Sequence, residues 1–131
     1  MLSKYLTATY EDGGRTWPRV DCWGLTIIAR TELFGLPVLS QFGRVDRHST
    51  VSFQRAYRTE VDRALDECPP APGAIAAALR RGNLVHVGLV VQKDGRQQVL
   101  EINPGSQARV VRLSEFIERF DQVVFYRDRT L

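Results

Sequence analysis

The chain has few cysteines, with only Cys22 and Cys68 among its 131 residues. Two cysteines form at most one bridge, so a disulfide-based scaffold is excluded. A zinc site built from both cysteines and the two histidines, His48 and His86, is not expected either. No CxxC or HxxxH pair places two such ligands close together. We therefore expect neither a metal nor another cofactor.

Long apolar runs are also missing. No run approaches the roughly 20 residues that a helix needs to cross a bilayer. The N-terminal stretch MLSKYLTATYEDGG lacks the apolar core of a secretory signal. We expect a protein made in the cytoplasm, without membrane insertion and without a classical signal peptide.

The excess of positive charge is small, with 18 Lys and Arg against 15 Asp and Glu. A mildly basic chain can favour anionic partners. Here, however, the arginines are interleaved with acids, as in RAYRTEVDR (55–63). None of the usual nucleic-acid-binding signatures is present, so we expect a solvated surface and no nucleic-acid partner. With 44% apolar residues, residues 1–131 are predicted to form one globular domain.

Two helices are predicted in the first half. Residues 22–34 carry apolar side chains at helical spacing, with Asp21 as the N-cap and Gly35 and Pro37 as the stop. A second helix is expected from about 50 to 66, capped by Ser49 or Thr50. The segment CPPAPG (68–73) then interrupts the pattern.

Strand patterns dominate after this break. A short apolar run at 73–80 precedes a strand at 84–92, and the turn signal KDGR leads into a return strand at 96–103. A strand at 108–113, a short helix at 113–120 and a final strand at 122–127 complete the pattern. Helices followed by a mostly antiparallel sheet indicate an α+β fold.

Cys22 stands in the first turn of the first predicted helix. Unpaired backbone N–H groups and the helix dipole favour a thiolate at this position. A nucleophilic thiol also needs a base nearby, usually a histidine. The alternative is a small buried hydrophobic residue, which is the commonest role of a free cysteine.

His86 is the candidate base, because His48 lies in the polar stretch RVDRHST and is expected at the surface. Strand alternation puts Val85, Val87, Leu89 and Val91 on one face, with Leu84, His86, Gly88 and Val90 on the other. Gly88 would then leave room beside the imidazole. A purely structural histidine is the alternative.

The return strand offers a third residue for the site. If Asp94 and Gly95 form the two-residue turn, Gly88 lies opposite Glu101 and His86 lies opposite Asn103. Glu101 and Asn103 both share the face of His86, and an oxygen from either could fix the imidazole tautomer. The hairpin geometry leaves the choice between them open.

These residues resemble the NlpC-type cell-wall cysteine peptidases, a family with a compact papain-like fold. The family pattern is a Tyr-x-x-Gly-Gly motif, an Asp-Cys motif, a His-Val-Gly strand and a polar third residue. The corresponding segments are YEDGG (10–14), DCWGL (21–25), HVGLVV (86–91) and VLEIN (99–103). They keep the family's order over most of the chain. The fold expected from the resemblance has the Cys on an N-terminal helix, packed on the sheet that carries the His.

The resemblance implies a peptidoglycan hydrolase that cleaves stem-peptide amide bonds through a thiol acyl-enzyme. Cys22 would be the nucleophile, His86 the base and Glu101 the third residue, with Asn103 as the alternative. Tyr10 and Asp21 would support the substrate or the oxyanion, together with the backbone N–H of Cys22. Ala74 replaces the acid that many relatives carry before the histidine strand, and Glu101 stands where His is common.

Trp23 and the RLSEF…YR ending resemble a branch encoded with phage tail genes. We therefore expect action at the cell wall or periplasm, reached through a phage tail or a dedicated export system. Two alternatives have the same fold. One is a structural tail assembly protein with little activity, partnered by other tail proteins, and the other is an antibacterial effector with an immunity protein.

Overall fold

The computed structural model describes residues 2–40 and 50–129. The predicted surface position of His48 and the predicted cap Ser49 lie outside the described residues. The N-terminal part contains α1 (Leu2–Tyr5), β1 (Thr9–Tyr10), β2 (Arg15–Thr16), β3 (Arg19–Val20), α2 (Cys22–Phe34) and α3 (Thr50–Ala64). The rest contains β4 (Leu65–Cys68), β5 (Ile75–Arg80), β6 (Asn83–Lys93), β7 (Arg96–Glu101), β8 (Arg109–Arg112), α4 (Leu113–Glu118) and β9 (Gln122–Asp128).

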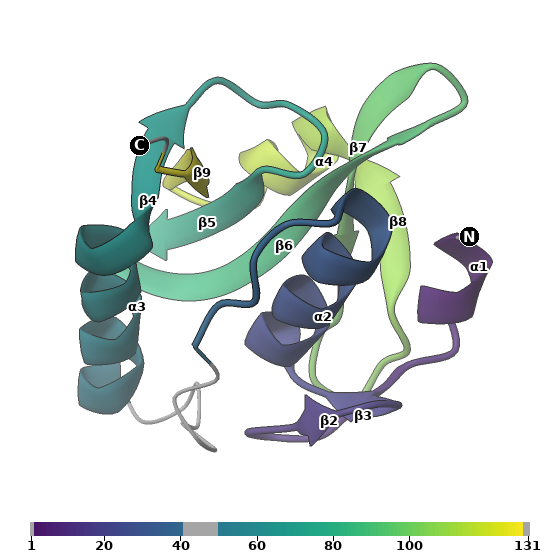
Figure 1. The fold of residues 1–131 in the computed structure, drawn as a ribbon, viewed down its shortest axis with the longest axis horizontal. Coiled ribbons are helices and arrows are strands. Elements are labelled where there is room, and N and C mark those ends of the chain that lie inside the picture. Colours follow the sequence, from purple (N-terminus) through teal and green to yellow (C-terminus); the bar gives the residue numbers. More distant parts are fainter. Residues whose placement is uncertain (1, 41–49, 130–131) are drawn as a thin grey trace.

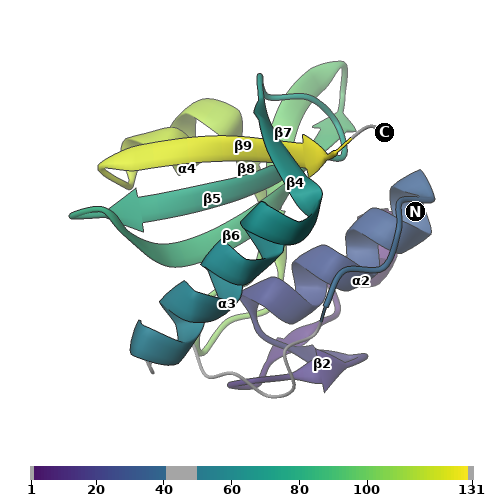
Figure 2. The ribbon, with the colours of Figure 1, turned by 60° about the vertical axis from the view of Figure 1, so that its left-hand side comes forward.

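The central element is a six-stranded antiparallel sheet of order β4-β9-β5-β6-β7-β8. Helices α2 and α3 lie on one face of it, and α4 lies on the other (Figures 1 and 2). A small three-stranded sheet, β1-β3-β2, precedes α2. No helix within residues 2–40 and 50–129 has the length and apolar character needed to cross a membrane.

Helix α2 forms as its sequence predicts. The Asp21 carboxylate accepts a hydrogen bond from the backbone N–H of Gly24 at 2.8 Å, which satisfies a group that the first helical turn leaves unpaired. At the other end Gly35 adopts φ 66° and donates its N–H to the carbonyl of Thr31. Both predicted ends of this helix are confirmed.

The buried residues form a separate core on each face of the sheet. On the α2 side, Leu25 and Ala29 pack with alternate residues of β6 and β7, among them Leu89 and Leu100. On the α4 side, Phe116 packs with Val90, Val99, Phe125 and small residues of β5. The alternation of strand side chains therefore decides on which side of the sheet each polar residue lies.

The hairpin between β6 and β7 is confirmed. Lys93 pairs with Arg96, so Asp94 and Gly95 are the turn residues, and both have positive φ, at 54° and 74°. The same register places Leu89 opposite Leu100. Continued by one pair, it puts Gly88 beside Glu101 at the end of β7.

Three parts of the fold differ from the prediction. The second helix ends at Ala64, two residues early, because Leu65–Cys68 pairs with β9 as an edge strand. The small sheet was not predicted because two-residue strands carry no periodic pattern. Strict alternation also fails at the start of β6, where the register with β5 shifts between Ala78 and Leu79. This β-bulge at Val85 turns Leu84 to the α2 side, opposite to its predicted face.

Candidate functional site

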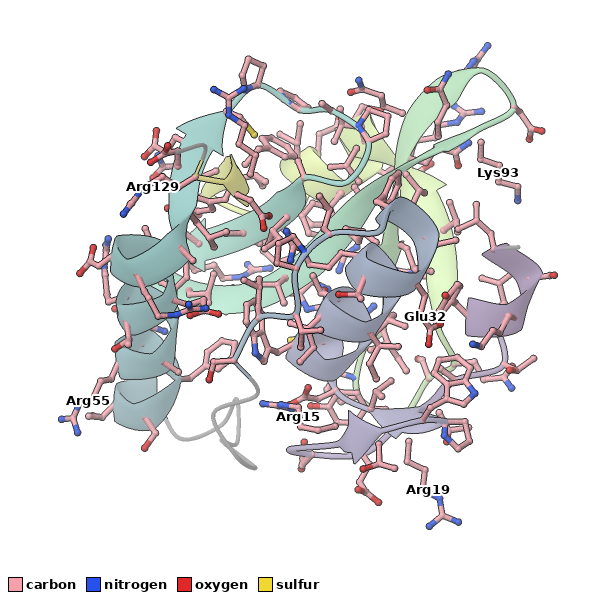
Figure 3. All side chains as sticks on the ribbon, in the orientation of Figure 1. Arg15, Arg19, Glu32, Arg55, Lys93 and Arg129 are labelled. Carbon is pink, nitrogen blue, oxygen red and sulfur yellow. The ribbon has the colours of Figure 1, made fainter. Side chains whose placement is uncertain are left out.

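Cys22 is the first residue of α2 and its side chain is buried, with 1% exposed. The residue before it, Asp21, is fully buried, and one oxygen accepts both the Gly24 N–H and a 2.5 Å hydrogen bond from Arg15 Nη1. Arg15, labelled in Figure 3, is itself buried. The aspartate of the DCWGL segment therefore fixes the helix start that carries the thiol and binds a cation from β2.

The two glycine-containing segments pack backbone against backbone. A Cβ on Gly24 would lie 2.2 Å from the carbonyl oxygen of Gly14, and a Cβ on Gly14 would lie 2.5 Å from that of Arg19. Gly14 also accepts the N–H of Asp21 at 3.2 Å. The YEDGG and DCWGL segments therefore contact each other through their backbones, where the small sheet meets α2. This close contact requires Gly14 and Gly24, because a side chain at either position would overlap the backbone.

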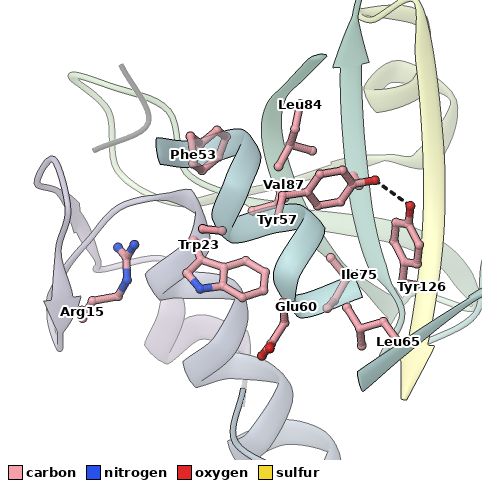
Figure 4. Close-up of a pocket in the computed structure, with 12 residues that line it drawn as sticks. Arg15, Trp23, Phe53, Tyr57, Glu60, Leu65, Ile75, Leu84, Val87 and Tyr126 are labelled. Atoms are coloured by element: carbon pink, nitrogen blue, oxygen red, sulfur yellow. Dashed lines mark hydrogen bonds between the residues drawn. The ribbon is translucent and has the colours of Figure 1, made fainter. Parts of the chain in front are cut away.

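The thiol lies in the core between the sheet and helices α2 and α3. Cys22 belongs to a buried apolar cluster with residues of α3, β4, β5, β6 and β9: Phe53, Leu65, Ile75, Ala77, Leu79, Leu84, Val87 and Tyr126. An adjoining pocket is lined by several of these side chains together with Trp23, Tyr57 and Glu60 (Figure 4). The environment of Cys22 is therefore mainly apolar.

His86 lies on β6 with 1% exposed. Its Nε2 is hydrogen-bonded to Glu101 Oε1 at 2.8 Å. The ring packs against two aromatic rings at the α4 end, with centroid separations of 5.7 Å to Phe116 and 5.9 Å to Phe120. The second interaction is nearly parallel, at 26°. The imidazole is held on one side by a carboxylate and on another by aromatic faces.

Glu101 is the centre of a buried charge network. Its second oxygen, Oε2, accepts hydrogen bonds from Arg109 Nε at 2.9 Å and from Arg119 Nη1 at 2.6 Å. Burial raises the pKa of Glu101, but the hydrogen bonds from His86 and Arg119 outweigh it and lower the pKa to about 2. The carboxylate is therefore ionised at neutral pH and offers a fixed negative charge to the imidazole.

Cys22 and His86 are on opposite sides of the sheet. His86 pairs with Ala78, which faces Phe116, whereas the next residue, Val87, belongs to the cluster of Cys22. The structure thus brings His86 and Glu101 together but places Cys22 in the other layer. In the described arrangement the His86 imidazole therefore does not face the Cys22 thiol.

The expectation that Gly88 leaves room beside His86 is wrong. A Cβ at this position would lie 2.5 Å from Val99 Cγ1, 3.0 Å from the Leu100 carbonyl and 3.5 Å from Phe116. The glycine is needed because β7 and α4 pack closely against this part of β6.

The alternative third residue, Asn103, lies at the edge of the same network. Its Oδ1 is 3.5 Å from Arg119 Nη2. The His86 imidazole is hydrogen-bonded to Glu101, although the hairpin register puts Asn103 directly opposite His86. Tyr10 lies on β1 and packs against the cluster around Leu25 and Leu100. The roles predicted for both residues stay predictions.

Several contacts around the site were not predicted from the sequence pattern. Trp23 Nε1 donates to the Ser40 carbonyl at 2.9 Å, and Glu60 accepts the Ser40 N–H at 2.7 Å, which holds the segment after α2 beside the pocket. Only 1% of the Glu60 surface is exposed, although charged residues lie near it in the sequence of α3. Only a buried acid at an apolar helical spacing could have indicated this contact.

Within residues 2–40 and 50–129, no cluster of three or more His, Cys, Asp or Glu side chains could hold a metal ion. Both cysteines are free thiols.

Neither a protein-family model nor a curated protein sequence matches the chain. Among solved structures, the chain is similar to the crystal structure of an N-acetylmuramoyl-L-alanine amidase from Bacteroides uniformis ATCC 8492. The TM-score is 0.62 at 11% sequence identity, covering 98% of this chain and 95% of the amidase chain. The α+β fold, an N-terminal helix on a six-stranded antiparallel sheet, is therefore similar to that of a cell-wall amidase. At this identity the likeness shows the fold alone.

Proposed function

We propose that the chain is a peptidoglycan hydrolase that cleaves a stem-peptide amide bond with Cys22 as the nucleophile. One observation carries the proposal. A cysteine opens a capped helix, beside a pocket, on a fold similar to that of an N-acetylmuramoyl-L-alanine amidase. The match to the NlpC-type motifs supports the same reading.

The proposed reaction has two steps. The Cys22 thiolate attacks the amide carbonyl carbon, the C–N bond breaks, and the leaving amine takes a proton from His86. Water then attacks the thioester carbon and gives a proton to His86, the C–S bond breaks, and the carboxylic acid and the Cys22 thiolate are released. The N–H of Cys22 would stabilise the oxyanion, and Tyr10 would support the substrate. Asp21 acts by holding the helix start in place.

Glu101 is the better supported third residue, because its carboxylate bonds the imidazole and is ionised. A negative charge there favours the imidazolium form that protonates the leaving amine. The step that the described arrangement does not provide is contact between His86 and Cys22. In the described arrangement the bond to Glu101 and the ring of Phe116 hold the imidazole on the α4 side of the sheet.

The setting of the reaction is also part of the proposal. The chain would act at the cell wall or periplasm, delivered by a phage tail or a dedicated export system. Its partners would be tail proteins or, for an antibacterial effector, an immunity protein.

A second candidate is a tail assembly protein that keeps the fold with little hydrolysis. The observation that favours it is the placement of Cys22 and His86 in different layers, both nearly fully buried. In this arrangement the imidazole of His86 does not face the thiol from which it would take a proton.

Digestion of purified peptidoglycan separates the two candidates. The wild-type protein should release new amino and carboxyl ends, identified by mass spectrometry of the fragments. Cys22→Ala should remove the activity, and His86→Ala should reduce it strongly while Asn103→Ala retains most of it. Absence of fragments from a folded wild-type protein would favour the assembly role. Release that is unchanged in Cys22→Ala would contradict the proposed nucleophile.

A further inference from the structure

Arg119, the residue that follows α4, contacts the groups that hold His86 in place. Its Nη1 donates to Glu101 Oε2 at 2.6 Å, the shortest of the three hydrogen bonds to this carboxylate. The guanidinium also lies over two aromatic rings, 5.5 Å from the centroid of Phe116 and 5.1 Å from that of Phe120. The same two rings pack against the imidazole. Arg119 therefore touches both the carboxylate and the aromatic wall beside the histidine.

The guanidinium of Arg119 is held more firmly than that of Arg109. A planar guanidinium that is stacked on aromatic faces loses little further freedom when it donates a hydrogen bond. The side chain of Arg119 is 32% exposed, whereas that of Arg109 is 53% exposed. Solvent therefore screens the charge of Arg119 less, and Arg119 is the stronger of the two cationic partners of Glu101.

The charge of Glu101 decides which nitrogen of the neutral His86 ring carries the proton. The pKa of Glu101 is about 2, so at neutral pH its oxygens only accept hydrogen bonds. His86 Nε2, 2.8 Å from Oε1, is therefore the protonated nitrogen, and Nδ1 keeps its lone pair. A group that fixes this carboxylate also fixes the tautomer of the imidazole.

Positive charge exceeds negative charge in this network. In the part of the chain that the structure describes, the elements packed around the imidazole contribute Glu101 from β7, Arg109 from β8, Arg80 from β5 and Arg119 after α4. The carboxylate favours the imidazolium form, whereas each guanidinium opposes it. Two guanidiniums already share the one carboxylate. An imidazolium would add a further positive charge at a side chain that is almost fully buried.

We propose that Arg119 is a positioning residue that holds Glu101 against His86 and limits formation of the imidazolium at neutral pH. The consequence for catalysis rests on the proposed function, because Arg119 would then set the pH range in which His86 can take a proton. Arg119 does not touch the reacting atoms, and Arg109 is the weaker second donor to the same oxygen.

Titration of the His86 ring tests this inference without any substrate. Long-range ¹H–¹⁵N spectra, recorded between about pH 4 and pH 9, report the tautomer and the titration midpoint of the imidazole, and His86→Gln assigns its signals. Arg119→Met and Arg119→Gln remove the charge, and the glutamine keeps an N–H donor for Glu101. Both should raise the midpoint by about one unit, the lower end of the range of 1–3 units for a charge within about 4–6 Å. Arg119→Lys keeps the charge and should stay close to the wild type.

Two arginines of β8 provide the comparison. Arg109→Met should raise the midpoint by less than Arg119→Met does, because Arg109 is more exposed. Arg112→Met is the matched control and should leave it unchanged, since Arg112 is exposed and alternation puts its side chain on the opposite face from Arg109. Equal midpoints in the wild type and both neutral variants would overturn the inference. A shift of the same size in Arg112→Met or in Arg119→Lys would overturn it as well.

The pH profile of hydrolysis separates this inference from the proposed function. The profile of kcat/KM reports the ionising groups of the free enzyme. In Arg119→Gln, the limb that reports His86 should move to higher pH by the amount found in the imidazole titration. A shifted titration with an unshifted activity profile would support the role of Arg119 and contradict His86 as the base. The same shift in a protein that cleaves nothing would still support the role of Arg119.

Discussion

The charge of Glu101 should be one of the largest pH-dependent contributions to the stability of this fold. Its pKa is lowered from 4.5 to about 2, because hydrogen bonds from His86 and Arg119 to the buried carboxylate outweigh the cost of burial. One pKa unit corresponds to about 1.4 kcal/mol, so this lowering corresponds to about 3 kcal/mol of folding free energy. A folded-state pKa below the unfolded value stabilises the protein above the unfolded pKa. That stability is lost as the pH falls from about 4.5 through about 2.

Glu101→Gln keeps the size of the side chain and removes the charge. The variant should lose about 3 kcal/mol at pH 7, because Arg109 and Arg119 are left without their shared carboxylate. The difference from the wild type should shrink as the pH falls below 4.5, because the wild-type carboxylate then becomes protonated as well.

Urea denaturation followed by tryptophan fluorescence between pH 7 and pH 2.5 measures this difference. Glu118→Gln, which removes an exposed carboxylate of α4, is the control and should change stability by less than about 0.5 kcal/mol. A Glu101→Gln protein as stable as the wild type at pH 7, or a deficit that does not change with pH, would refute the reasoning.

Three further predictions concern packing, a buried ion pair and thiol reactivity. Gly88→Ala should lose about 1–3 kcal/mol in the same denaturation assay, since its Cβ would overlap Val99, and unchanged stability would mean that β7 moves freely. Asp128→Ala should lose about 3–5 kcal/mol, because it removes the ion-pair partner of the fully buried Arg30; a loss below 1 kcal/mol would count against that pair. At pH 7, iodoacetamide should label Cys22 before the more exposed Cys68, because the start of α2 favours the Cys22 thiolate whereas burial raises the pKa of the Cys68 thiol; peptide mapping that finds the reverse order would contradict an activated Cys22.

The sequence predicts those parts of the fold that depend on local patterns. The helix at Cys22–Phe34 has a capping aspartate before it and a glycine after it, and both act as expected. The Asp94-Gly95 turn sets the hairpin register, which brings Glu101 close enough to His86 for a hydrogen bond. These features are predictable because each involves only neighbouring residues or one tight turn.

The layer in which each site residue lies was harder to predict. Alternation separates His86 from Val87, but only the packing of α2 and α4 decides which face carries the thiol. The bulge at Val85 is invisible in the sequence, because the extra residue is another valine in an apolar strand. A glycine in a strand is compatible with an open space beside it or with a neighbouring strand that packs closely against it. In this fold Val99 of β7 packs closely against Gly88.

Trapping of the acyl-enzyme tests the proposed role of Cys22 most directly. The wild-type protein is mixed with soluble peptidoglycan fragments, quenched in acid within seconds and measured as intact protein by mass spectrometry. We expect a mass increase equal to the acyl part of the cleaved fragment, mapped to the peptide containing Cys22 and absent in Cys22→Ala. Continued fragment release by a folded Cys22→Ala protein, or an acyl group mapped to another residue, would contradict the proposed mechanism.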